Sequence, residues 1–218
     1  MPPKQESFRR RELPHWDIEG ATYFVTCCLA GSLPALGRLP ITEEKSMASA
    51  ERSDAGGRQP TRSSVGFATR ERLLDTAVGV RWLEDRRLAA EVERSMLYFN
   101  GTRYMLLAYV VMPNHVHWVF RPLASWREQS GSRAARETIM HSFSRHTALV
   151  CNRLLGRKGR FWQHESYDRV VRDMDELERV VAYIEYNPVK SGLCERPEQW
   201  EFSSAWRGER LPREDTAS

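Results

Sequence analysis

Two histidines in the segment Asn114-His115-Val116-His117-Trp118 are the side chains of this chain best suited to bind a metal ion. The segment follows the apolar run Leu106 to Met112 and continues into further apolar residues, a pattern that predicts a β-strand. Successive side chains of a strand point to opposite faces, so His115 and His117 are expected to project together. Two neutral imidazoles held in this way can bind one divalent cation. The alternative is that both rings are polar residues on a solvated strand face.

A tyrosine and an asparagine near the C-terminal end of the chain form a second candidate group. Apolar residues recur at helical spacing after Asp173, and at about 100° per residue Tyr183 and Asn187 lie together on one flank of the apolar stripe. Tyr186 points away from that flank. A phenol can act as a nucleophile and an amide oxygen can bind a hard cation, so the two residues could complete a His, His, Asn site for Mg²⁺ or Mn²⁺. The alternative is that Tyr183 only packs and that Asn187, before Pro188, ends the helix.

Positive charge is the third feature with a chemical meaning. The net charge is +4 and the isoelectric point is near 9.0, a modest excess that is compatible with binding to nucleic acid. Cations beside aromatic residues could bind phosphates and stack on unpaired bases, and the alternative for each is a solvated surface. The candidate DNA-binding residues are Arg9, Arg10, Arg11, Arg157, Lys158, Arg160, Trp162 and Lys190.

The elements that would position these residues follow from hydrophobic periodicity and from turn signals. The expected order is βαββαβα, which suits an α+β fold of the ferredoxin-like, split βαβ type: a four-stranded antiparallel sheet with helices packed on it. The expected elements are strand 21–30, helix 83–99, strands 103–112 and 115–122 joined at Pro113-Asn114, helix 134–155, strand 161–172, and a helix from Asp173 that Pro188 ends at or just before Asn187.

Length and composition favour one principal domain. With 218 residues, 41% of them hydrophobic, the chain can bury one sizeable core. We expect a domain over 1–206, a polar insertion at 37–66 that carries no chemistry, and a polar tail at 207–218. The four cysteines show neither zinc-site spacing nor the density of a disulfide scaffold. No apolar run resembles a membrane span or a secretory signal, so we expect a soluble cytoplasmic protein.

Three segments resemble the REP-associated tyrosine transposases, within the single-tyrosine HUH transposase family. They are Leu107 to Phe120 with the two histidines, Gly159 to Gln163 running into Tyr167 to Arg172, and Tyr183-Ile-Glu-Tyr-Asn-Pro-Val-Lys190-Ser-Gly-Leu193. The motifs occur in the family's order, and the resemblance spans roughly residues 9–206 apart from the insertion. Related insertion-sequence transposases often carry glutamine at the position of Asn187. Of the family's site residues, the third metal ligand is therefore the one that this chain matches least directly.

The resemblance implies an enzyme that cuts and rejoins single-stranded DNA near a hairpin. His115 and His117 would be its metal pair, and Tyr183 would form a 5′-phosphotyrosine. The implied partner is single-stranded or hairpin DNA in a bacterial-type cytoplasm, at the nucleoid when DNA is bound, and no nucleotide cofactor is expected because the chain has no Walker loop. Whether the protein is a monomer or a homodimer stays open. Two other classes also stay open: a domesticated DNA- or RNA-binding protein that does not cleave, and a metal hydrolase that uses activated water.

Overall fold

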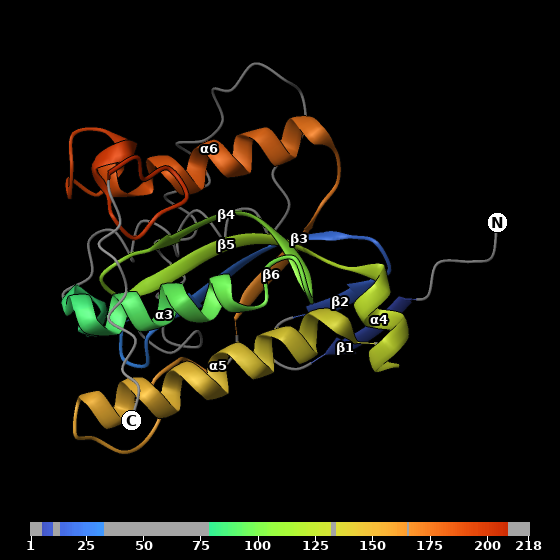
Figure 1. The fold of residues 1–218 in the computed structure, drawn as a ribbon, viewed down its shortest axis with the longest axis horizontal. Coiled ribbons are helices and arrows are strands. Elements are labelled where there is room, and N and C mark those ends of the chain that lie inside the picture. The colour runs from blue at the N-terminus through green and yellow to red at the C-terminus, as the bar shows by residue number, and fades with distance from the viewer. Residues whose placement is uncertain (1–5, 11–13, 33–78, 132–133, 165, 209–218) are drawn as a thin grey trace, which may run out of the picture.

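The structure is a computed structural model that describes residues 6–10, 14–32, 79–131, 134–164 and 166–208 (Figure 1). The polar insertion expected at 37–66 lies outside the described residues, as does the tail from residue 209 onward. Within the described residues, no helix is both long and apolar enough to cross a membrane.

A four-stranded antiparallel sheet forms the centre of the fold. Its strands are β3 (Thr22–Cys28), β4 (Tyr104–Val111), β5 (His115–Pro122) and β6 (Tyr167–Val171), in the spatial order β4-β5-β3-β6. The first and third strands of the βαββαβ unit are thus the central pair, which is the split βαβ order. The expected ferredoxin-like α+β fold is confirmed.

Helices cover both faces of this sheet (Figure 1). The helices α3 (Arg86–Tyr98) and α5 (Ala135–Leu154) lie on one face, and α6 (Met174–Lys190) lies on the other. Short 3₁₀ helices, η2 (Trp82–Glu84) and η3 (Pro197–Gln199), precede α3 and follow α6. Because α6 is the only one of these three long helices on its face, its residues decide what meets that side of the sheet.

The alternation of side chains along the strands divides the core into two layers. The layer toward α3 and α5 contains Trp118 and Phe120 of β5, whereas Val119 packs in the layer with α6. The aromatic residues of β5 therefore anchor the larger core, as the sequence pattern predicts. The intervening positions of β5, including both histidines, face α6.

The turn between β4 and β5 is as tight as the sequence predicts. The amide of Met112 donates to the carbonyl of His115 at 2.9 Å, which leaves Pro113 and Asn114 as the two residues of the loop. The carbonyl of Pro113 accepts a hydrogen bond of 3.0 Å from Leu83, so the loop is tied to η2. A short, anchored turn gives His115 a fixed position at the start of β5.

Three elements, two strands at the N-terminal side and a helix after β5, are additions to the expected order. The strands β1 (Glu6–Arg10) and β2 (Pro14–Ile18) form a separate two-stranded antiparallel sheet, and α4 (Ala124–Ser130) follows β5. Asp17 of β2 accepts from Arg127 of α4 at 3.2 Å and from the backbone amide of Arg136 at 2.9 Å. This buried carboxylate connects the additional elements to the start of α5.

The last strand and the last helix differ from their expected bounds. Residues 161–163 make only a bridge and single hydrogen bonds to the end of β3, so β6 starts at Tyr167 and the expectation of a strand from Phe161 is wrong. Pro188 lies inside α6 and does not end it, contrary to prediction. A proline removes one backbone hydrogen bond, and here the helix continues because Ser191 and Leu193 donate to the carbonyls of Asn187 and Pro188.

Candidate active site

The two histidines of β5 meet at the face covered by α6. Their Nε2 atoms are 3.0 Å apart, their ring centroids are 4.5 Å apart, and the residues are 1% and 0% exposed. The predicted projection of His115 and His117 to one face, opposite to Trp118, is confirmed. The two rings form a buried pair of nitrogen ligands. The alternative that they are polar residues on a solvated strand face is therefore wrong.

Each imidazole is held from behind through its Nδ1 atom. His115 Nδ1 lies 2.6 Å from Asn114 Oδ1, and His117 Nδ1 lies 2.8 Å from Thr26 Oγ1, which is its neighbour across the β3–β5 ladder. An amide oxygen only accepts, so His115 Nδ1 donates and its Nε2 carries a lone pair when the ring is neutral. The Thr26 hydroxyl can accept or donate and therefore suits either tautomer of His117.

This arrangement fits a divalent cation. If both rings donate from Nδ1, two lone pairs face each other across 3.0 Å, and a cation that both nitrogens bind would relieve their repulsion. Partners at Nδ1 that fix the tautomer and the ring direction are the usual second layer of a histidine metal site. Thr26 and Asn114 supply that layer here, and neither was among the residues selected from the sequence.

The candidate nucleophile lies beside the histidine pair of the same chain. The ring centroid of Tyr183 is 5.5 Å from that of His117, and both rings contact Phe24 of β3, at 6.2 Å and 5.5 Å. Tyr186 is 55% exposed, as the helical wheel predicts. A single chain thus brings the phenol and the imidazoles together, while the role of Tyr183 as nucleophile stays a prediction.

Asn187, the proposed third ligand, is a buried polar side chain that lacks a protein partner. It is 1% exposed, and neither its Oδ1 nor its Nδ2 atom is hydrogen bonded. Burying an unpaired amide costs on the order of 1–3 kcal/mol, so such a group calls for an explanation. No group of three or more His, Cys, Asp or Glu side chains in the described residues could hold a metal. The role of Asn187 as third ligand stays a prediction.

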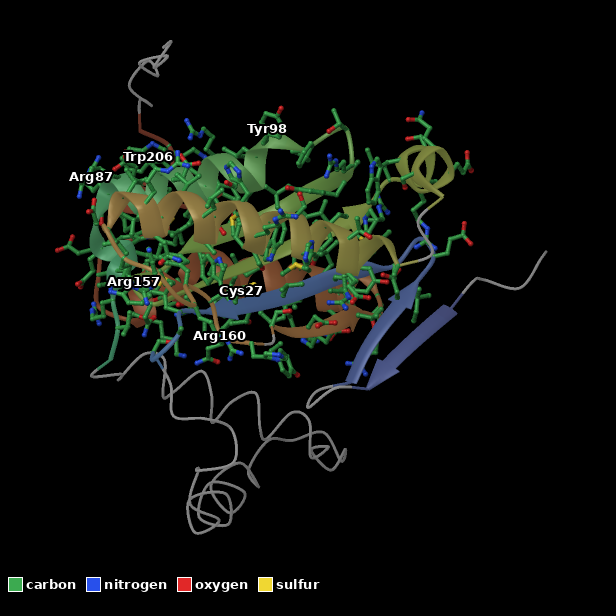
Figure 2. The ribbon with its side chains drawn as sticks, turned by 90° about the horizontal axis from the view of Figure 1, so that it is seen from below. Cys27, Arg87, Tyr98, Arg157, Arg160 and Trp206 are labelled. Atoms are coloured by element: carbon green, nitrogen blue, oxygen red, sulfur yellow. The ribbon has the colours of Figure 1, made fainter. Side chains whose placement is uncertain are left out.

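The segment with the cations Arg157, Lys158 and Arg160 leads to the end of the sheet where His115 lies. The amide of Gln163 donates to the carbonyl of Cys28 at 2.8 Å, and Cys28 pairs with His115 in the ladder. Arg157 and Arg160 are seen near the end of β3 in Figure 2. Lys158 and Arg160 are exposed to solvent. The segment that follows these cations is thus joined to the strand next to His115.

The expectation that Trp162 stacks on bases is wrong. Trp162 is 7% exposed, its indole N–H donates to Thr147 Oγ1 at 2.8 Å, and its ring lies 5.7 Å from Phe143. The half-buried aromatic in this region is Trp82, which stacks on Phe161 at 5.5 Å. An alternating pattern does not reveal which aromatic residues a distant helix covers, and α5 covers Trp162.

Trp82 was missed by the sequence analysis, and no pattern around it marks it. The guanidinium carbon of Arg157 lies 3.9 Å from the Trp82 ring centroid, and Arg157 Nη1 donates to Asn152 Oδ1 at 2.9 Å. The cation of Arg157 is therefore fixed over an aromatic face. Lys158 and Arg160 have no such support among the interactions of this segment.

The structure describes the side chain of Lys190 but not those of Arg9, Arg10 and Arg11. Lys190 Nζ lies 5.9 Å from the ring centroid of Tyr183, so this cation belongs to the same site. Arg9 and Arg10 end β1, but their side chains lie outside the described part, and Arg11 is outside it altogether. Their predicted contacts with DNA stay predictions.

A cavity of about 550 Å³ lies on the other face of the sheet, between α3 and α5. Its lining includes Tyr98, Phe99, Arg103, Tyr104, Ile139 and Phe143. None of the candidate metal-binding, nucleophilic or DNA-binding residues lines it. The candidate active site is therefore separate from this cavity.

Comparison with known proteins agrees with the resemblance that the sequence motifs indicate. No family model matches the chain. A Haemophilus influenzae protein provisionally named REP-associated tyrosine transposase is 30% identical over 107 residues, which cover 46% of this chain and 58% of the relative. The chain thus matches little more than half of that relative's length. The resemblance stated from the sequence is confirmed by this relative.

One solved structure is also similar. It is described as a REP-associated tyrosine transposase bound to a REP hairpin, and it is 18% identical, with a TM-score of 0.44 and coverage of 94% of this chain and 96% of that chain.

Proposed function

We propose that this chain is a metal-dependent transposase of the REP-associated tyrosine type, which cleaves and rejoins single-stranded DNA near hairpins. The observation that carries the proposal is the position of Tyr183, whose ring lies 5.5 Å from His117 of the same chain. The similarity to a protein named as such a transposase supports it. The fold supplies what the chemistry requires: a rigid strand for the histidines and a helix that crosses above them.

His115, His117 and Asn187 are the residues that would hold a divalent cation, Mg²⁺ or Mn²⁺. The chemistry that such a cation supplies is polarisation of a phosphate oxygen, which stabilises the charge of the transition state. The chain's own part is to keep the donors in position. Thr26 and Asn114 fix the imidazole planes through Nδ1, and burial of Asn187 at 1% exposure keeps water from competing for its amide.

The covalent step belongs to Tyr183. Its phenol oxygen attacks the phosphorus, the bond from phosphorus to the 3′ oxygen breaks, and the phenol proton passes to solvent while the leaving oxygen gains one. The product is a 5′-phosphotyrosine and a free 3′ hydroxyl. Attack by another 3′ hydroxyl on this adduct rejoins DNA and releases Tyr183, so the bond energy is conserved and no nucleotide cofactor is needed. Phe24 limits the motion of the phenol ring by packing edge-on against it.

The proposed partner is single-stranded or hairpin DNA, bound through phosphates. Lys190 lies 5.9 Å from the Tyr183 ring, Lys158 and Arg160 are exposed, and Arg157 is fixed over Trp82. If about five phosphates are neutralised, the slope of log K against log salt should be roughly −3 to −4 for a single strand. A binding constant that does not change with salt would contradict this surface.

The decisive experiment traps the covalent intermediate. The full chain is incubated with an oligonucleotide that carries a hairpin and a single-stranded flank, in the presence of Mn²⁺, and is then denatured and separated by size. We expect a DNA-protein adduct for the natural chain and for Tyr186→Phe, and none for Tyr183→Phe. Tyr186 is the matched control because it lies on the same helix, three residues on, and is exposed.

Two outcomes would replace the proposal by another function. Strand cleavage that persists in Tyr183→Phe without an adduct would identify a metal hydrolase that uses water. Binding of hairpin DNA or RNA without cleavage, across several metals and several hairpins, would identify a binding protein that has kept the fold.

A further inference from the structure

Arg169 of β6 lies on the same face of the sheet as the candidate active site. It pairs with Phe24 in the β3–β6 ladder, and its guanidinium carbon is 5.3 Å from the Phe24 ring centroid. That same ring contacts both His117 and Tyr183. One aromatic side chain therefore separates the Arg169 cation from the metal pair and the nucleophile.

The position of α6 leaves Arg169 accessible. The helix packs mainly on β4 and β5, whereas β6 is the opposite edge of the sheet. The side chain of Arg169 is 33% exposed, although the ring beneath it, Phe24, is fully buried. A strand of DNA that reaches the histidines from this edge would pass Arg169 first.

Arg169 shares its carboxylate partner with a second arginine. Its Nη1 atom pairs with Glu176, whose carboxylate also accepts from the Arg172 backbone N–H and Nε, both at 2.9 Å. These two arginines lower the pKa of Glu176 to about 2 against the cost of its burial, so the carboxylate is ionised at neutral pH. Two guanidinium groups thus share this carboxylate, and Arg172 also interacts with the charge of Asp173.

We propose that Arg169 binds a backbone phosphate of the substrate strand, next to the phosphate that Tyr183 attacks. This inference rests on the proposed function and names a contact for its substrate. A guanidinium has five N–H donors in a planar fork that matches a phosphate, and Glu176 engages only one end of the fork in the described structure. Glu176 fixes the direction of the side chain, and the Phe24 ring lies beneath its guanidinium group.

A purely structural role for Arg169 is the competing explanation, and Arg172 provides the matched control. Both arginines neutralise Glu176, but Arg172 follows β6 and its side chain is 70% exposed. If Arg169 acts only by neutralising Glu176, then Arg169→Met and Arg172→Met should have the same consequences. If Arg169 binds DNA, only the first should change binding.

The test measures the binding of a hairpin-bearing single-stranded oligonucleotide by fluorescence anisotropy over a range of salt concentrations. For Arg169→Met we expect about tenfold weaker binding or more and a salt slope less steep by roughly 0.7. For Arg172→Met we expect the natural slope and affinity. Arg169→Lys keeps the charge and the pairing with Glu176, so it is the control for a loss of folding. We expect this variant to keep the natural salt slope.

A neutral methylphosphonate placed at successive positions around the cleavage site identifies the phosphate. At the position that Arg169 contacts, the substitution should weaken binding to the natural chain by about as much as Arg169→Met does, and should add nothing further in that variant. The inference is overturned if Arg169→Met and Arg172→Met bind with equal affinity and slope, or if the effects add at every position. These readouts need no cleavage, so the absence of an adduct would refute the proposed function without removing the phosphate contact.

Discussion

Thr26 has no contact with DNA in the proposed mechanism, yet replacing it with valine should disturb metal binding. Its hydroxyl lies 2.8 Å from His117 Nδ1, and the residue is fully buried. Valine preserves the volume and removes only the hydroxyl. The imidazole then loses the partner that fixes its direction, because the group that faces its Nδ1 atom is now a methyl.

The size of the effect follows from the burial of this hydrogen bond. A buried polar atom left unpaired costs about 1–3 kcal/mol of folding free energy. A lost partner behind a metal-binding histidine weakens metal affinity or activity by about 10–100-fold. We therefore expect the Mn²⁺ concentration for half-maximal adduct formation to rise by about that factor in Thr26→Val, with little change in the affinity for DNA.

Thr147→Val is the control for the loss of stability. Thr147 is also fully buried, and it donates to the Phe143 carbonyl and accepts from Trp162, each at 2.8 Å. It packs with the other face of the sheet. We expect a comparable loss of thermal stability with an unchanged Mn²⁺ requirement. The reasoning is refuted if Thr26→Val keeps the natural Mn²⁺ dependence, or if Thr147→Val shifts it equally.

Three further predictions concern buried groups. Asn187→Leu should raise the melting temperature of the metal-free protein, since it removes two unpaired buried polar atoms, and should weaken adduct formation; a fall in both would contradict the role of Asn187 as a ligand. Glu176 has a folded pKa of about 2, below its usual 4.5, so its contribution to stability is complete above pH 4.5 and is lost as the pH falls toward 2. Glu176→Gln should lack this loss of stability in acid. The prediction is refuted if the stability of the natural chain and of the variant falls by the same amount between pH 4.5 and pH 2. Trp162→Phe should lower stability, because the hydrogen bond to Thr147 is lost, and should leave DNA affinity unchanged; weaker binding with natural stability would show that Trp162 reaches DNA after all.

The central strands and the long helices could be predicted because their patterns are strong and local. The alternation around His115 and His117 and the turn at Pro113 and Asn114 correctly predict a strand face shared by the two imidazoles. The helical spacing likewise places Tyr183 on the flank of α6 that meets the sheet. Periodicity captures which face a residue occupies, and this decides most of the site.

What the sequence did not reveal depends on pairing between distant segments. Thr26 is defined as a site residue only by the register that sets it opposite His117, 91 positions later in the chain. Trp162 looked available for stacking because nothing local shows that α5 covers it. The end of α6 was placed too early because the rule for proline treats the local hydrogen bond alone, while Ser191 and Leu193 continue the bonding beyond Pro188.

The central claim is that Tyr183 is the residue that becomes covalently attached to DNA. Its most direct test is tandem mass spectrometry of the digested adduct formed by the natural chain with hairpin DNA and Mn²⁺. The account predicts a nucleotide joined through a 5′ phosphate to Tyr183 alone. A nucleotide on Tyr186 or on any other residue, or attachment through a 3′ phosphate, would contradict it.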